Sequence, residues 1–160
     1  MSLSKPDVVL DDIDLKILTI LQKHGRTKRN DLAESVGLSL PSASERIRKL
    51  EESGIIMGYH AVLDPVLCGK SLTAFIFVTV DSSRHYAAFL ENAKGQDDIA
   101  ECHAITGEGT HLLKVRSADT HALERLLAKI QSWAGVTSTR TNLVLSSAKE
   151  TTRIRIGRNG

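Results

Sequence analysis

The sequence predicts an α+β protein with two different halves, and three observations support this fold class. Residues 13–50 carry apolar side chains at helical spacing, with no strand-like run among them. Residues 72–145 alternate between short runs rich in β-branched residues and further helical patterns. Pro65 and Gly69 separate the two patterns and mark the best domain boundary. The expected parts are a helical domain over 8–57, a tether strand and linker over 58–70, a mixed domain over 71–150, and a tail or edge strand over 151–160.

Composition narrows the class of protein. The 160-residue chain has the apolar and charged fractions of a soluble globular protein. No apolar run approaches the roughly 20 residues that a membrane helix needs, and the first residues lack the apolar core of a signal peptide. We therefore expect a cytoplasmic protein with no membrane partner. The net charge of +2 is too small to indicate a nucleic-acid binder by itself.

The first expected element is a helix that begins with Asp11 or Asp12 as its cap. His24 and Gly25 end it. Its apolar stripe recurs at i, i+4, i+5 and i+8 and consists of Ile13, Ile17, Leu18 and Leu21. This helix is expected to pack against the two helices that follow it.

Residues 28–50, KRNDLAESVGLSLPSASERIRKL, predict a helix-turn-helix. Gly37 can end the first helix in a left-handed conformation, and Ser39 can cap the second. The core-facing residues are expected to be Leu32, Ala33 and Val36 in the first helix and Ala43, Ile47 and Leu50 in the second. The extended segment that follows, ending at Pro65, makes the whole head winged-helix-like.

The outward residues of the second helix point to double-stranded DNA. Small hydroxyls near its start, with long cations behind them, suit a helix whose N-terminal end approaches base edges while its flanks hold phosphates. Residues 23–49 carry seven lysines and arginines against three acids, which gives this region a local positive excess. The candidate DNA-binding residues are Lys28, Arg29, Ser39, Ser42, Ser44, Glu45, Arg46, Arg48 and Lys49.

Different roles are expected within that set. Arg46 and Arg48 are expected on or beside the major groove, while Lys28 and Arg29 hold phosphate. An ordinary amphipathic helix pair with a solvated charged face remains the alternative reading of the same residues.

The C-terminal half has the element order β-α-β-β-α-β. Strands are expected over 72–80, 99–106, 111–116 and 136–145, with a turn over 107–110 that joins the middle two as a hairpin. The helical stripes consist of Tyr86, Phe89, Leu90 and Ala93, and of Leu123, Leu126, Leu127 and Ile130 after a cap at Asp119 or Thr120. This order predicts a ferredoxin-like antiparallel sheet with both helices on one face.

The other face of that sheet must meet solvent or a partner. Phe75, Phe77, Leu143 and Leu145 indicate that it is not fully polar, so we expect the C-terminal half to be an oligomerisation module. Residues 149–160 are basic and alternate weakly, which leaves open whether they add an edge strand to a neighbour or fray.

No metal site is expected. The adjacent Cys102 and His103 would point to opposite faces of a strand, and no second Cys/His pair lies nearby to complete a tetrahedral site. Cys68 and Cys102 are expected to be reduced thiols, since disulfides are rare in the cytosol.

Several separated motifs, in order, resemble the Lrp/AsnC family of leucine-responsive and feast/famine regulators. They are LDDIDLKILTILQKHGR at 10–26, LAESVGLS at 32–39, ERIRKLEESGII at 45–56, GYHAVLDP at 58–65, ECHAITG at 101–107, LLKV at 112–115 and GVTSTRTNLVL at 135–145. The resemblance covers nearly the whole chain. It implies a transcriptional regulator that binds DNA as dimers assembled into tetramers or octamers, needs no cofactor, and senses a small molecule, usually an amino acid, between subunits.

The resemblance also implies where an effector binds. The matching positions are the hairpin loop and the last strand, namely Gly107, Glu108, Gly109, Thr110, His111, Thr139, Thr141 and Asn142. Glycines let backbone N–H groups approach a carboxylate closely. The family's common form is Gly-x-x-Asp-Tyr, whereas Thr110 replaces the Asp and His111 the aromatic residue. Three readings stay open: Glu108 substitutes for the missing Asp, the ligand is not a simple amino acid, or the loop is an unliganded turn.

Two other functions compete with an effector-responsive regulator. Decarboxylases of modified tetrapyrroles resemble this family, and such an enzyme would need His and Arg side chains that converge on a carboxylate-bearing macrocycle. Only His103 and His111 lie near one hairpin, which disfavours that alternative. A pure assembly module whose head no longer binds DNA is the second competitor, and the basic outward residues argue against it.

Overall fold

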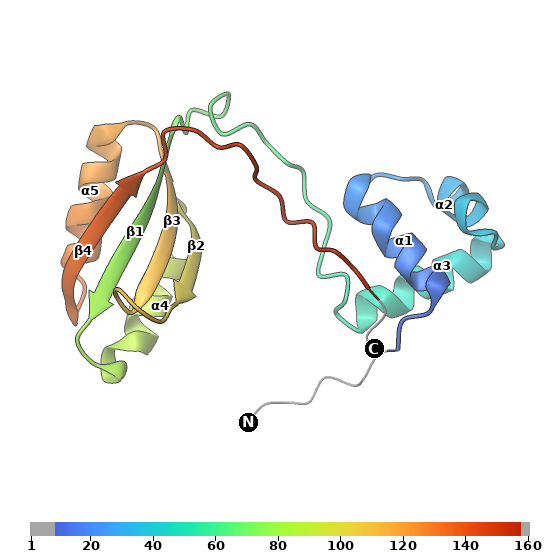
Figure 1. Ribbon diagram of the computed structural model, residues 1–160, viewed down its shortest axis with the longest axis horizontal. Helices are drawn as coiled ribbons and strands as arrows, with labels where there is room; N and C mark the ends of the chain where they lie inside the picture. Colours follow the sequence, from blue (N-terminus) through green and yellow to red (C-terminus); the bar gives the residue numbers. More distant parts are fainter. Residues whose placement is uncertain (1–8, 158–160) are drawn as a thin grey trace. The chain divides into compact units, whose positions relative to one another are not determined.

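The protein consists of two compact units (Figure 1), seen in a computed structural model that describes residues 9–157. Among the described residues, 9–62 and 150–157 form one unit, which we call the head. Residues 63–149 form the other, which we call the sheet unit. Residue 8, where the expected N-terminal domain begins, and residues 158–160 of the expected tail lie outside the described residues.

Three helices build the head: α1 (Asp12–Lys23), α2 (Arg29–Val36) and α3 (Leu40–Glu52). Asp11 caps α1 in a reciprocal arrangement, because its side chain accepts from the Asp14 backbone N–H and the Asp14 side chain accepts from that of Asp11. The apolar stripes meet in one core, as the sequence predicts, and its buried members are Ile17, Leu18, Leu32, Ile47 and Leu50.

The turn between α2 and α3 has the predicted helix-turn-helix geometry. Gly37 ends α2 in the left-handed region with φ of 70°. Ser39 then caps α3, since its hydroxyl accepts the backbone N–H of Ser42 at 3.3 Å. These two residues set the angle at which α3 leaves α2.

The tether differs from the expectation. Residues 58–64 form no strand in this chain, and a single turn follows at 65–69. A strand needs a neighbouring strand for its backbone N–H and C=O groups, and none is described beside this segment. An apolar and extended sequence pattern therefore overestimated the regular structure of the linker.

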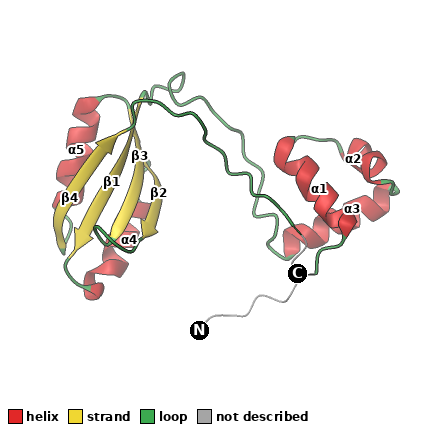
Figure 2. Cartoon of the chain, viewed as in Figure 1, coloured by secondary structure: helices red, strands yellow, loops and turns green. Residues whose placement is uncertain are grey.

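The sheet unit has the predicted βαββαβ order (Figure 2). The strands are β1 (Leu72–Val80), β2 (Ile99–Ala104), β3 (His111–Ser117) and β4 (Val136–Leu143). The helices are a short 3₁₀ turn η1 (Ser83–His85), α4 (Tyr86–Lys94) and α5 (Thr120–Gln131). The strand order is β2-β3-β1-β4 and all neighbours are antiparallel. This is the ferredoxin-like arrangement.

Both helices cover the same face of the sheet. Alternate residues of β1 and β3 are buried against them, as expected for a sheet with one covered face. The core that results contains Ala74, Ile76, Val78, Val80, Phe89, Ala93, Leu113, Val115, Leu123, Leu126 and Ile130.

The opposite, open face of the sheet holds Phe75 and Phe77, which are half-buried, as the sequence predicts. The prediction was wrong for Leu143, because it pairs with Ala74 and so lies on the helix-covered face. The pairing of β4 with β1, which decides the face of each side chain, is not encoded in the local pattern of β4. Leu145 follows β4 and is 96% exposed.

The C-terminal tail contacts the head. The side chain of Gln22 in α1 hydrogen-bonds the backbone of Ile154, and Ile156 packs against the core of the head. Within this chain the described tail forms no strand and contacts the head instead.

Among residues 9–157, no helix is long and apolar enough to cross a membrane. The same residues contain no group of three or more His, Cys, Asp and Glu placed to hold a metal ion. Cys68 and Cys102 are free thiols.

Candidate DNA-binding and effector sites

Helix α3 is divided sharply into a buried and an exposed side. Ala43, Ile47 and Leu50 are buried in the head. The opposite side presents exposed residues at helical spacing, and these are Pro41, Ser42, Glu45, Arg48, Lys49 and Glu52. A polar helix face of this kind, preceded by a tight turn from a shorter helix, is the surface that a helix-turn-helix offers to the major groove.

The exposed face of α3 is linked by ion pairs in the free protein. Arg48 contacts Glu45 at 2.6 Å and Glu52 at 2.5 Å, and Lys49 lies 3.8 Å from Glu45. Its two carboxylate partners raise the pKa of Arg48, and the Arg48 hydrogen bond lowers the pKa of Glu45. Exposed pairs of this type are weak and exchange readily, so Arg48 can leave its carboxylates for a phosphate or a base edge.

Arg46 has partners within the head that the sequence analysis did not anticipate. Its guanidinium donates to Asp11 at 2.7 Å and to Asp14 at 2.9 Å, at the N-terminus of α1. Position 46 flanks the buried stripe of α3 and does not lie on its exposed face. Arg46 therefore fastens α1 to α3, and the two carboxylates raise its pKa.

The remaining predicted DNA-binding residues outside the ion pairs lie at the start of α2 and along α3. Lys28 and Arg29 are exposed at the start of α2, and Ser39 and Ser42 share a hydroxyl contact of 2.9 Å at the start of α3. Ser44 is half-buried at the side of α3.

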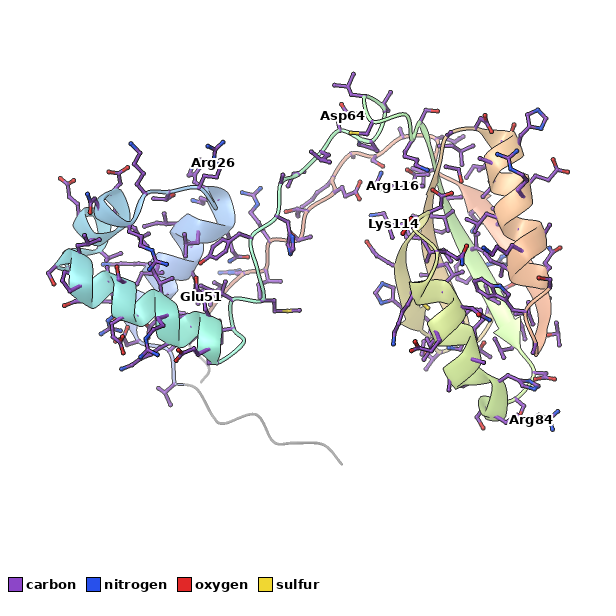
Figure 3. The ribbon with its side chains drawn as sticks, turned by 180° about the vertical axis from the view of Figure 1, so that it is seen from behind. Arg26, Glu51, Asp64, Arg84, Lys114 and Arg116 are labelled. Atoms are coloured by element: carbon purple, nitrogen blue, oxygen red, sulfur yellow. The ribbon has the colours of Figure 1, made fainter. Side chains whose placement is uncertain are left out.

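Tyr59 holds the segment after α3 close to the helices. Its hydroxyl donates to Glu51 at 2.9 Å, and burial, reinforced by this carboxylate, raises the pKa of Tyr59 to about 12. Glu51, labelled in Figure 3, is therefore occupied within the head. Tyr59 and Arg29 also line one shallow hollow of about 170 Å³, so the segment reaches the start of α2.

The predicted effector loop, 107–110, bends back against β1. Gly107 and Gly109 have φ of 96° and 81°, conformations that favour glycine. A Cβ on Gly109 would lie 3.1 Å from the Val78 carbonyl oxygen, so the loop approaches β1 more closely than other residues permit. The Thr110 backbone N–H donates to the same oxygen at 2.9 Å.

Glu108 has a partner that the sequence analysis missed. It forms an ion pair with Arg140 in β4, and the Arg140 guanidinium lies 4.8 Å from the ring centroid of Phe77. Both charges are more than half exposed. Arg140 is the one cation within β4, and it lies on the open face because it pairs with Phe77.

Thr110 uses its hydroxyl within the fold. The oxygen accepts the Val80 N–H at 3.0 Å, contacts Nδ1 of His111 at 2.8 Å and donates to the Val78 carbonyl at 3.2 Å. These bonds stabilise the register shift between Thr79 and Val80. An uncharged hydroxyl at this position is therefore structural.

His111 does not face the loop surface. It is 1% exposed and packs against Tyr86 and Phe89, with ring centroids 4.9 and 4.6 Å away. Its assignment to an effector site is corrected, because β3 alternation turns it into the core. His103 is exposed beside Glu101 on the other face, so the two histidines do not converge as a tetrapyrrole decarboxylase would require.

The last strand splits the remaining candidates between its faces. Thr139 pairs with Val78 and its hydroxyl accepts from Gln131 at 2.8 Å, on the helix-covered face, where Thr141 also lies. Asn142 pairs with Phe75 on the open face, the same face as Arg140. The structure therefore brings Glu108 and Arg140 together, with Asn142 on the same face.

A helix-turn-helix with a polar recognition helix, joined to a sheet unit with a glycine-rich loop, defines a two-domain transcriptional regulator. A family model described as the Lrp/AsnC ligand binding domain matches residues 73–154, and one described as winged helix-turn-helix DNA-binding matches 10–57. The chain belongs to the Lrp/AsnC family.

Relatives and solved structures agree with this assignment. The leucine-responsive regulatory protein of Escherichia coli is 36% identical over 156 residues, covering 96% of this chain and 95% of that protein. An uncharacterised HTH-type transcriptional regulator of Bacillus subtilis, YezC, is 46% identical over 115 residues, covering 72% and 81%. A Neisseria meningitidis transcriptional regulator complexed with L-methionine superposes with a TM-score of 0.87, at 32% identity and over 91% of this chain and 96% of that one.

Arg46 and Arg48 differ in their partners, because Arg46 bonds to α1 and Arg48 bonds within α3. Arg46→Ala should lower the free energy of unfolding of the head by about 1–2 kcal/mol, because two charge-assisted hydrogen bonds to α1 are lost. Arg48→Ala should leave thermal unfolding nearly unchanged and weaken DNA binding at least tenfold. Thermal denaturation and fluorescence anisotropy with operator DNA measure the two effects. Equal effects of both variants on both readouts would contradict this division.

The burial of His111 predicts a pH dependence of stability. Desolvation lowers its pKa below the ordinary 6.5, so the unfolded chain binds a proton more readily than the native one. The free energy of unfolding should therefore fall as the pH drops below about 6.5. His111→Phe should flatten this dependence between pH 7 and 5, measured as Tm at several pH values. His121→Gln, at an exposed position of α5, is the control and should retain the wild-type slope.

Proposed function

We propose that this protein is a sequence-specific regulator of transcription whose DNA binding or assembly responds to an amino acid or a related metabolite. The observation that carries the proposal is the exposed polar face of α3, held in place by a fully apolar opposite side. The proposed groove-facing residues are Ser42, Glu45, Arg48 and Lys49, with Lys28 and Arg29 on phosphate. The relatives reported above are named as regulators, and they give no support to the decarboxylase alternative.

The effector proposal rests on the Glu108–Arg140 pair. An amino acid carries a carboxylate and an ammonium group on the same α-carbon, and this pair offers a cation and an anion side by side. Because the pair is exposed and weak, an amino acid can separate it. The carboxylate of the ligand then binds Arg140, and its ammonium group binds Glu108. Glu108 then supplies the negative charge that Thr110 does not. The methionine complex of the Neisseria relative supports the amino-acid class.

Self-association is the third part of the proposal. Phe75, Phe77 and Leu112 are half-buried on the open face, and the segment from residue 57 to residue 67 exposes large apolar side chains. Those that are more than 60% exposed are Met57, Val62, Leu63, Val66 and Leu67. Apolar surface of this extent favours a second copy of the chain, first as a dimer and then as tetramers or octamers.

A dimer predicts the form of the operator. Two copies of α3 should read half-sites about 34–36 Å apart, or a multiple of that distance, so DNA fragments selected by the protein should share an imperfect palindrome. Sequencing of fragments retained from a random pool measures this. Retention without any shared sequence would contradict specific readout by α3.

The effector proposal predicts a ligand-dependent rise in stability. A screen against the twenty amino acids should find at least one that raises Tm, because a ligand of the native state stabilises it by mass action. Glu108→Gln and Arg140→Gln should each abolish the rise. Glu124→Gln, on an exposed position of α5, should keep it. A screen in which no amino acid raises the Tm of the wild-type protein would reject the amino-acid class.

A further inference from the structure

The tail is attached to the head by specific contacts. The Gln22 side chain bonds both backbone groups of Ile154, accepting its N–H at 2.8 Å and donating to its carbonyl at 3.1 Å. A side-chain amide used in this way imitates a neighbouring strand. Two residues further on, Ile156 packs against the apolar core of the head. The segment is therefore held at one backbone position and one side chain.

This attachment leaves two arginines pointing to solvent. Arg153 and Arg155 alternate with Ile154 and Ile156 and are exposed. Alternate residues of an extended chain share a side, so the two cations are presented together while the backbone is held. Among the described residues neither forms an ion pair, and the only recorded side-chain bond of the two is a 3.4 Å contact from Arg153 to the Thr151 hydroxyl.

The tail arginines extend a cationic region of the head. Gln22, which bonds the tail, is followed directly by the cation Lys23. No aspartate or glutamate occurs over residues 22–29 or 151–157. Figure 3 shows Arg26 on the outside of the turn between α1 and α2. We call the combined set the basic band, and it consists of Lys23, Arg26, Lys28, Arg29, Arg153 and Arg155.

The charge of the basic band is not neutralised within the head. Several carboxylates of the head already have other partners. Asp11 and Asp14 pair with Arg46, Glu45 and Glu52 pair with Arg48, and Glu51 accepts a hydrogen bond from Tyr59. Within residues 9–62 and 150–157, no ion pair is recorded for any member of the basic band. The members of the basic band lie at the end of α1, at the start of α2 and in the tail, and none of them has a recorded ion pair in the described part of the head.

We propose that the docked tail is part of the DNA interface, and that Arg153 and Arg155 hold backbone phosphates beside the segment read by α3. The inference rests on the proposed DNA-binding function and extends it to residues more than a hundred positions away in sequence. Double-stranded DNA is the partner that fits, because the band includes Lys28 and Arg29, the proposed phosphate contacts, and because its members are exposed cations. Such contacts add affinity and salt dependence but carry no sequence information.

The test uses the full chain with operator DNA and with unrelated DNA of the same length. Arg153→Ala combined with Arg155→Ala should reduce the slope of log K against log salt by about 1 for each arginine in each bound head, and weaken binding by about tenfold at 0.1 M salt. Both DNAs should lose affinity equally, since phosphate contacts do not read bases. Arg125→Ala with Lys129→Ala, two exposed cations of α5 in the sheet unit, is the matched control for net charge.

A second variant tests the attachment itself. Gln22→Ala removes no charge, yet it should lower the same slope because the tail is no longer held against α1. In the background that lacks both arginines, Gln22→Ala should have no further effect on binding, as expected for residues that act through one contact.

The outcomes separate the two proposals. Loss of operator binding in Arg48→Ala, with wild-type affinity and salt slope in the tail variants, would overturn the tail inference and leave the regulator proposal standing. If the tail variant and the α5 control lost affinity for DNA equally, net charge alone would explain the loss. That result would also overturn the tail inference. Loss of operator specificity alone would assign the arginines to base readout instead of phosphate.

Discussion

The rotation of α3 about its own axis is the constraint on which the DNA-binding surface depends. Three apolar residues, Ala43, Ile47 and Leu50, bury one side of the helix, and each is at most 3% exposed. Arg46 adds a second point of contact, because it donates two hydrogen bonds to carboxylates at the N-terminus of α1. With these two contacts the exposed side must present Glu45, Arg48 and Lys49. A change of one residue in either pattern would turn different side chains outward.

An equivalent constraint governs the sheet unit. Because both helices cover one face, strand alternation decides which side chains enter the core and which lie on the open face. His111 enters the core and becomes a neutral packing residue, while Arg140 and Glu108 remain outside the core. The loop at 107–110 reaches this site only because Gly109 allows it to press against the Val78 carbonyl. The proposed effector pair therefore lies away from the packed core, which occupies the helix-covered face of the same sheet.

Most of the fold was predictable because local signals agreed with tertiary packing. The caps Asp11 and Ser39, the left-handed Gly37 and the apolar periods predicted the five α-helices and the four strands of the described chain, but not the 3₁₀ turn η1. Prediction of the sites was less successful. In the sequence Arg46 cannot be distinguished from the neighbouring cations Arg48 and Lys49. Its contact with α1 is seen only in the structure, because its carboxylate partners lie more than 30 residues earlier. Arg140 was missed because an isolated cation on a strand has no local signal.

The sequence by itself determined the element order, the helix-turn-helix and the family, because these depend on short-range periodicity, caps and turns. Only the tertiary structure decided which charged residues form ion pairs within the protein and which remain free to bind a ligand or DNA. Ion pairs such as those of Arg46 join segments that are distant in the chain. The tertiary structure also decided the position of the tail. Residues 151–157 carry no strong pattern of their own, and their conformation depends on Gln22 and on the apolar core of the head, which exist as a surface only after α1 has packed.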